Sequence, residues 1–163
     1  MSTTPDTPLS IYEGDRRDLD AVMKVMTDAF DPSYGEAWSR TQCSGIMIQP
    51  GVWLTLANYD GEPAGFTLAR MIVDEAELLL IGVRPQFRRA GIGTALLDRN
   101  CQVAATLGAM RVHLEVREGN SATQFYRTRG FEPVGRRKNY YRGAQREQFD
   151  AITLACALKP PNK

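Results

Sequence analysis

Residues Glu77 to Leu97 have the sequence ELLLIGVRPQFRRAGIGTALL, and the pattern of apolar residues changes within this stretch. The apolar run at 78–83 is too short for a helix and predicts a buried strand. From Ile92 onward, apolar side chains recur at helical spacing, at positions 96, 103 and 107. We therefore predict a strand, a loop with two glycines, and a long helix that ends at Gly108.

The two glycines, Gly91 and Gly93, stand where the predicted helix begins. A turn without side chains exposes backbone N–H groups, and the helix dipole adds partial positive charge at the same place. Arg88 and Arg89 come directly before the first glycine. This combination predicts a loop that binds a diphosphate.

Three kinds of glycine loop bind phosphates after a strand. A Walker loop needs a lysine where Thr94 stands, and a Rossmann turn needs a third glycine where Leu96 stands. The six residues 88–93, RRAGIG, fit the remaining pattern, Arg/Gln-x-x-Gly-x-Gly/Ala. That pattern is the acetyl-CoA pyrophosphate loop of the GCN5-related N-acetyltransferases, and the chain resembles that family here. Glycines that merely close a strand–helix turn are the alternative.

Further motifs extend the resemblance. They are LEVREGN at 114–120, then Phe125-Tyr126, then Gly130-Phe131. The motifs DEA at 74–76, RKNYY at 137–141 and DAI at 150–152 are similar to those of the RimI-type ribosomal-protein alanine N-acetyltransferases. Residues 74–158 carry this likeness, whereas residues 9–73 match only in the order of elements. Two features depart from the family. The spacing from Asn120 to Tyr126 is six residues, one shorter than expected, and the segment Asp31–Ser39 replaces a Pro-Trp-Ser element.

The resemblance implies a role for particular residues. The backbone of Ile81, Gly82 and Val83 would hold the pantetheine arm of acetyl-CoA as an extra strand would. Asn120 would contact the cofactor further along, Glu115 would be the general base and Tyr126 the general acid. The pyrophosphate would be held by Arg88, Arg89, Ala90, Gly91, Ile92, Gly93 and Thr94. No metal is implied.

The predicted strand at 110–116 places Glu115 on the same face as His113, because side chains alternate along a strand. A partly buried carboxylate there could take the proton of an amine. Alternatively, Glu115 could pair with Arg111 or Arg117, and Tyr126 could be a core tyrosine. His113 is interpreted as a structural histidine. Alternation also predicts that one of Tyr140 and Tyr141 lines the acceptor slot. No Cys–His–Asp arrangement is recognisable, which favours direct attack of the amine in a ternary complex.

The sequence predicts one domain at residues 9–158, with a frayed N-terminus at 1–8 and a tail at 159–163. The predicted strands are 9–12, 52–59, 64–73, 75–83, 110–116, 131–141 and 149–158. The first predicted helix is capped by Asp15 or Asp18, and the second spans about 36–47. The third starts after the glycine loop, and the fourth spans 121–129. The family implies an α/β (α+β) fold: a mixed, mostly antiparallel twisted sheet with one splayed parallel pair and helices on both faces.

Composition limits the partners. The formal net charge of +1 gives no global field for nucleic acid. No basic leader or apolar run of about 20 residues is present, so we expect no signal peptide and no membrane span. Three scattered cysteines suggest reduced thiols, and hence a cytoplasmic protein. We expect a monomer or a weak dimer.

These observations predict an acetyl-CoA-dependent N-acetyltransferase. The resemblance points to the N-terminal alanine of a small-subunit ribosomal protein as the acceptor. A small-molecule amine or a lysine side chain is the first alternative, and a non-catalytic acyl-CoA-binding module is the second.

Overall fold

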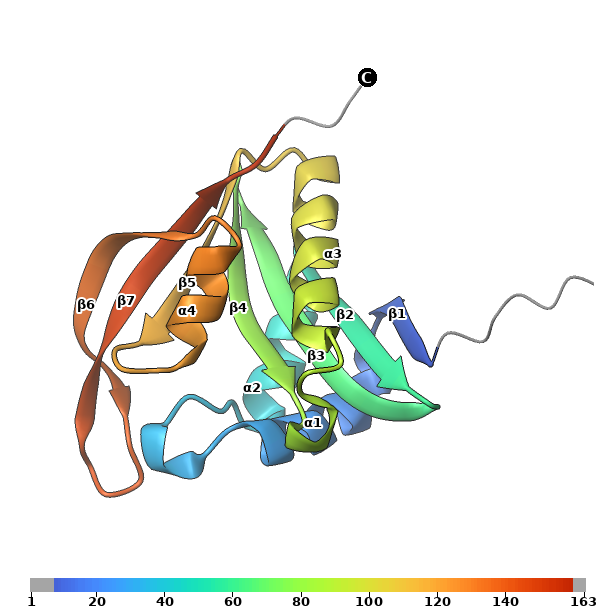
Figure 1. Ribbon diagram of the computed structural model, residues 1–163, viewed down its shortest axis with the longest axis horizontal. Coiled ribbons are helices and arrows are strands. Elements are labelled where there is room, and N and C mark those ends of the chain that lie inside the picture. The colour runs from blue at the N-terminus through green and yellow to red at the C-terminus, as the bar shows by residue number, and fades with distance from the viewer. Residues whose placement is uncertain (1–7, 160–163) are drawn as a thin grey trace, which may run out of the picture.

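The computed structural model describes residues 8–159, and within this range the chain forms one seven-stranded sheet with four α-helices (Figure 1). The strands are β1 Leu9–Gly14, β2 Val52–Tyr59, β3 Glu62–Ile72, β4 Glu75–Val83, β5 Arg111–Arg117, β6 Glu132–Arg142 and β7 Gln148–Ala157. The helices are α1 Leu19–Ala29, α2 Arg40–Met47, α3 Ile92–Thr106 and α4 Ala122–Thr128. The predicted frayed N-terminus and tail lie almost entirely outside the described residues.

The strand order in the sheet is β1-β2-β3-β4-β5-β7-β6, and only β4 and β5 are parallel. These two strands pair at only four positions, from Glu75 opposite Arg111 to Leu78 opposite Leu114. The next residue, Leu79, is skipped in the pairing of β4 with β3, which marks a bulge. Because a bulge bends the strand that carries it, β4 turns away from β5 at this point. The predicted splayed parallel pair is confirmed.

Helices cover both faces of the sheet (Figure 1). On one face, Val25 and Met26 of α1 and Cys43 of α2 pack against Phe66 and other apolar side chains of β2–β4. On the other face, Ile92 and Leu96 of α3 pack against small residues of β2 and β3. Leu97 and Ala104 of α3 and Tyr126 of the short α4 belong to a further cluster, which also includes residues of β5 and β7. The predicted layering is therefore confirmed.

The helix predicted at residues 36–47 starts later than expected. Ser39 is its N-cap, because its hydroxyl accepts the Gln42 N–H and the Gln42 side chain accepts the Ser39 N–H. This capping box fixes the first helical residue as Arg40. The segment 31–39 is consequently a long connection, of which only Pro32–Tyr34 forms a 3-10 turn.

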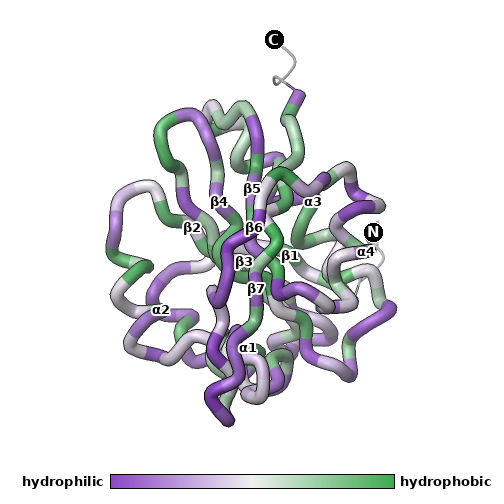
Figure 2. Tube along the Cα trace, turned by 90° about the vertical axis from the view of Figure 1, so that its left-hand side faces the viewer, coloured by the Kyte–Doolittle hydropathy of each residue, from purple (hydrophilic) through white to green (hydrophobic). Residues whose placement is uncertain are grey.

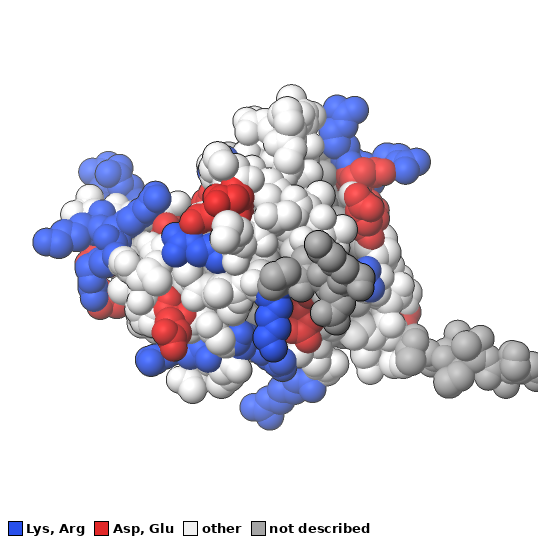
Figure 3. Space-filling view, turned by 90° about the horizontal axis from the view of Figure 1, so that it is seen from above, with Lys and Arg blue, Asp and Glu red and all other residues white. Residues whose placement is uncertain are grey.

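Exposed polar residues are concentrated at the edge strand β6 and its connection to β7, which is strongly hydrophilic in Figure 2. The buried apolar residues lie mainly in the helices and in β2–β5 and β7. Figure 3 shows Lys and Arg interspersed with Asp and Glu over one face, as expected for a net charge of +1. Within residues 8–159, no helix has the length and apolar character needed to cross a membrane.

Candidate active site

A cavity of about 630 Å³ opens where β4 and β5 diverge. Its walls come from β4, β5, α4, the glycine loop, the first turn of α3 and the segment 31–39. Every residue predicted for cofactor binding or catalysis lines this cavity except Ala90, which lies within the same loop. The fold therefore brings together residues from Ile81 to Tyr126 that the sequence analysis had linked only through motifs.

The glycine loop curls tightly before α3. Arg89 and Gly91 both have left-handed backbone conformations, with φ of 71° and 76°, and Gly91 is the N-cap of α3. The first helical hydrogen bond runs from the Ala95 N–H to the Gly91 carbonyl, at 3.0 Å. The N–H groups that precede Ala95 in this first turn therefore have no acceptor within the helix. Free N–H groups at the start of a 15-residue helix are the kind of site that favours an anion.

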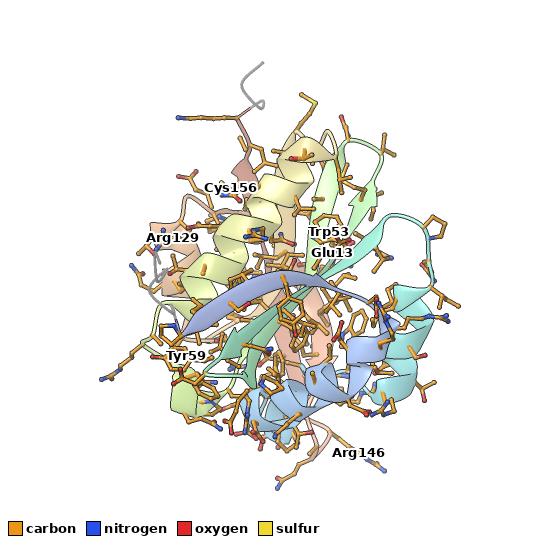
Figure 4. The ribbon with its side chains drawn as sticks, turned by 90° about the vertical axis from the view of Figure 1, so that its right-hand side faces the viewer. Glu13, Trp53, Tyr59, Arg129, Arg146 and Cys156 are labelled. Atoms are coloured by element: carbon orange, nitrogen blue, oxygen red, sulfur yellow. The ribbon has the colours of Figure 1, made fainter. Side chains whose placement is uncertain are left out.

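Side chains hold this loop in place from three directions. Tyr59, labelled in Figure 4, packs its ring on Phe87 with the centroids 5.6 Å apart. The Arg88 guanidinium donates to the carbonyl of Ala29 at the end of α1. The guanidinium of Arg129, which also appears in Figure 4, donates to the Thr94 hydroxyl at 3.0 Å. Arg88 and Arg129 thus add positive charge beside the loop.

The backbone of β4 offers a free edge beside the loop. Ile81, Gly82 and Val83 pair with β3 on one side, but β5 has no pairing with them on the other. Their backbone groups that face the gap are available to an extended ligand, which could bind there as an added strand. A long, partly polar ligand that lies along β4 and reaches the start of α3 would therefore meet backbone donors and acceptors at both places.

Glu115 points into the cavity and has partners that the sequence did not predict. Its side chain is 9% exposed, accepts a hydrogen bond from the Thr153 hydroxyl at 2.6 Å, and pairs with Arg137 at 3.2 Å. The expected alternatives are wrong, because Arg111 pairs with Glu75 and Arg117 pairs with Glu36. Thr153 lies directly opposite Glu115 on β7, so the sheet register fixes the carboxylate.

Tyr126 serves the core and the cavity at once. Its ring lies in the apolar cluster beneath α4 and packs edge-on against Phe131, with the centroids 5.9 Å apart. The same residue lines the cavity. Burial raises the pKa of its phenol well above 10, and the charge of Glu36 raises it further. The phenol is therefore protonated throughout the neutral range and can donate a hydrogen bond.

The segment 31–39, which replaces a family element that helps to shape the acceptor site, supplies one wall of the cavity, although none of its residues was predicted individually. Tyr34, Glu36 and Trp38 of this segment line the cavity. The Glu36 carboxylate pairs with Arg117 at 2.8 Å and accepts a hydrogen bond from the Asn120 amide at 3.0 Å. The alternating Tyr-x-Glu-x-Trp pattern was visible in the sequence, but its partners lie more than 80 residues away.

The side chain of Asn120 has two contacts in this structure. Its amide nitrogen donates to Glu36, and its carbonyl oxygen accepts the N–H of Ala122, the first residue of α4. Asn120 therefore joins the wall at 31–39 to the start of the helix that carries Tyr126. It lines the cavity, and its contact with the cofactor stays a prediction.

Two other predictions have different outcomes. Both Tyr140 and Tyr141 line the cavity, so the expected alternation is wrong. The pairing of β6 with β7 shifts register between Arg137 and Tyr141, and Asn139 has a φ of 55°, so neighbouring side chains no longer alternate. His113 lies 3.3 Å from Glu75 and is absent from the cavity walls, in agreement with a structural role.

Comparisons with known proteins agree with this geometry. Residues 19–131 match the model of the Acetyltransferase (GNAT) family. Over 100 residues the chain is 38% identical to the ribosomal protein bS18-alanine N-acetyltransferase of Salmonella typhimurium, covering 61% of this chain and 67% of that protein. A relative with the same name from Haemophilus influenzae is 36% identical over 94 residues, covering 58% of this chain and 64% of that protein. The matches thus span about two thirds of these relatives.

A solved structure extends the likeness to almost the whole chain. The crystal structure of the ribosomal-protein-S18-alanine N-acetyltransferase from Escherichia coli superimposes with a TM-score of 0.82 at 26% identity. The superposition covers 95% of this chain and 97% of that one. The family model covers more than half of the chain, which confirms the resemblance found in the glycine loop and in the motifs after it. The chain belongs to the GCN5-related (GNAT) acetyltransferase family.

Proposed function

We propose that this protein transfers the acetyl group of acetyl-CoA to the α-amine of an N-terminal alanine, and that its acceptor is a small-subunit ribosomal protein. The observation that carries the proposal is the cavity at the splayed strands. It places the anion-binding turn of α3, the free edge of β4 and Glu115 around one space. The relatives named as bS18-alanine N-acetyltransferases support the choice of acceptor.

The cofactor fits the residues present. The N–H groups at Gly93 and Thr94 and the nearby Arg88 and Arg89 would bind the pyrophosphate, because a helix N-terminus favours anions. The pantetheine arm would lie along the free edge of β4 at residues 81–83. When bound, acetyl-CoA supplies a thioester carbonyl activated for attack by an amine.

The chemistry assigned to this chain's residues follows from their positions. The amine nitrogen attacks the thioester carbonyl, the C–S bond breaks, and the nitrogen must lose a proton. Glu115, oriented by Thr153, would accept that proton directly or through a water molecule. Because the pKa of Tyr126 is raised, full proton transfer to a thiolate of pKa about 8.5 is uphill. Tyr126 would instead stabilise the departing thiolate by donating a hydrogen bond.

The charges of the cavity favour a peptide terminus over a polyamine. Each of the three glutamates that line it has an arginine partner: Glu36 has Arg117, Glu77 has Arg70 and Glu115 has Arg137. Asp31 also lines the cavity, but so do Arg88 and Arg89, so its wall offers little of the unbalanced negative charge that would attract a multiply charged amine. A single α-amine, which is unprotonated in about half of the molecules near pH 8, is a better match for this wall.

Replacing Tyr126 with phenylalanine should lower kcat by roughly 10–10²-fold, the worth of one hydrogen bond to a charged group. The affinity for CoA should change little, because the ring and its packing against Phe131 remain. Steady-state kinetics with acetyl-CoA and an alanine-started peptide measure the first quantity, and calorimetric titration with CoA measures the second. An unchanged kcat would show that Tyr126 contributes only to the packing of the core.

The acceptor is tested with two forms of one peptide that starts with alanine and also contains lysine. We expect acetylation of the peptide with a free N-terminus and no acetylation of the same peptide with a blocked N-terminus. Mass spectrometry of the products locates the acetyl group. Transfer to lysine in the blocked peptide would assign the enzyme to the lysine-directed alternative, and spermidine in a parallel reaction tests a small-molecule acceptor.

A further inference from the structure

The segment 31–39 is held against the rest of the protein by one nearly buried ion pair. The side chains of Glu36 and Arg117 are 15% and 12% exposed and lie 2.8 Å apart. The other carboxylate oxygen of Glu36 accepts from Asn120. A pair removed from solvent in this way is costly to break, because each charge is then left without its partner. The contact joins residues 81 positions apart in the chain.

The same arginine is covered by an aromatic ring from the same segment. The Arg117 guanidinium lies 3.7 Å from the centroid of the Tyr34 ring, which is close for a cation–π contact. Tyr34 in turn packs edge-on against Phe149 of β7, with the centroids 5.6 Å apart. Arg117 is therefore held between Tyr34 and Glu36. We call these three residues the latch.

Backbone packing beside the latch leaves little room for movement. Gly35 has a φ of 68°, and a Cβ atom there would lie 1.9 Å from the carbonyl oxygen of Arg142. A Cβ atom at Gly143 would lie 2.3 Å from the carbonyl oxygen of Ser33. The segment 31–39 thus meets the β6–β7 hairpin backbone to backbone, as their positions in Figure 1 show. Only glycine permits this approach.

We propose that Glu36 is a positioning residue that fixes the acceptor wall through Arg117 and so selects peptides with a small first side chain. The inference rests on the proposed function and adds a determinant of its specificity. Tyr34 and Trp38, the two aromatic residues on either side of Glu36 in the sequence, also line the cavity. In this proposal the closed latch keeps these two side chains in place, and they limit the room for the first side chain of the acceptor peptide. When the ion pair of the latch is broken, the wall can move and admit a larger first side chain of the peptide.

The test compares kinetics with two peptides that differ only in the first residue, alanine or leucine. In Glu36→Gln, we expect KM for the alanine peptide to rise roughly tenfold while KM for acetyl-CoA stays within about twofold. The ratio of kcat/KM for alanine over leucine should fall by a similar factor. Arg117→Gln should give the same change, and the double variant should be no worse than either single variant, because both open one latch.

Two matched controls isolate the latch from general destabilisation. Glu75→Gln and Arg111→Gln break another glutamate–arginine pair that involves the same strand, outside the cavity. They should leave the selectivity ratio at the wild-type value. Tyr34→Leu keeps the ion pair but removes the ring over Arg117, and should lower the ratio without loss of the fold. A wild-type ratio in Glu36→Gln or in Arg117→Gln would overturn the inference, whatever the result for Tyr34→Leu, because Tyr34 itself lines the cavity.

Hydrogen exchange separates failure of this inference from failure of the proposed function. If the wild-type enzyme acetylates no peptide, the proposed acceptor is wrong, yet the latch is still measurable. Glu36→Gln should accelerate amide exchange across residues 31–39 and leave α3 unchanged. Unchanged exchange in that segment would show that Glu36 does not hold the wall, whatever the enzyme's acceptor is.

Discussion

Glu115→Gln should lower kcat by roughly 10²–10³-fold at neutral pH, the loss expected when a general base is removed. Glutamine keeps the shape of the side chain and can still accept the hydrogen bond from Thr153. What disappears is the capacity to take the proton that the attacking amine must lose. Steady-state kinetics with saturating acetyl-CoA and an alanine-started peptide measure the loss.

The dependence of kcat on pH shows whether Glu115 acts by accepting the proton of the amine. An α-amino group has a pKa of about 7.7–8.0, so at neutral pH most acceptor molecules carry the extra proton. Above that pKa the free amine no longer needs the first deprotonation, and part of the lost rate should return in Glu115→Gln. The wild-type enzyme should show a smaller rise over the same range, because Glu115 already assists at neutral pH.

Arg137→Gln is the matched control for the ion pair. It breaks the contact with Glu115 but keeps the carboxylate, and the Arg137 side chain is 62% exposed. Because the arginine end of this pair lies largely in solvent and Thr153 still holds the carboxylate, this variant should retain most of its kcat. If Glu115→Gln instead keeps near-wild-type kcat at every pH, the carboxylate is a structural partner of Thr153 and Arg137, and the base lies elsewhere.

The parts of the site that the sequence predicted depend on local pattern. The strand β4, the loop at 88–91 and the helix α3 are contiguous, so apolar periodicity and two glycines were enough to predict them. The faces of β5 also follow from alternation, which placed Glu115 opposite the buried residues. Family motifs then linked these elements to Tyr126 and Asn120.

The parts that were missed depend on contacts between distant segments. Glu36 was expected at the start of a helix, but the capping box at Ser39 leaves it in the connection before α2. Its partners, Arg117 and Asn120, cannot be inferred from neighbouring residues. Similarly, a shift in register between β6 and β7 brought both Tyr140 and Tyr141 to the cavity, where strict alternation allowed only one.

Substitution of Gly93 should have the second large effect, a loss of affinity for CoA, because this residue lies in the turn where the pyrophosphate would bind. The surroundings of Gly93 allow an effect of its substitution on binding to be distinguished from an effect on folding. A Cβ atom at this position would lie 3.7 Å from Phe125 and 3.9 Å from Val83, which are ordinary van der Waals distances. The protein without a ligand can therefore accommodate a side chain at this position.

Gly93→Val should raise the dissociation constant of CoA by roughly 10²-fold, or about 3 kcal/mol, because a branched side chain blocks the approach of the phosphates to the backbone N–H groups. Calorimetric titration with CoA measures it. Gly45→Val is the matched control, since Gly45 is also helical and has open space around it, but lies in α2 outside the cavity. Both variants should unfold at similar temperatures, and only Gly93→Val should lose affinity. A Gly93→Val protein that is folded and binds CoA as tightly as the wild type would exclude this turn as the pyrophosphate site.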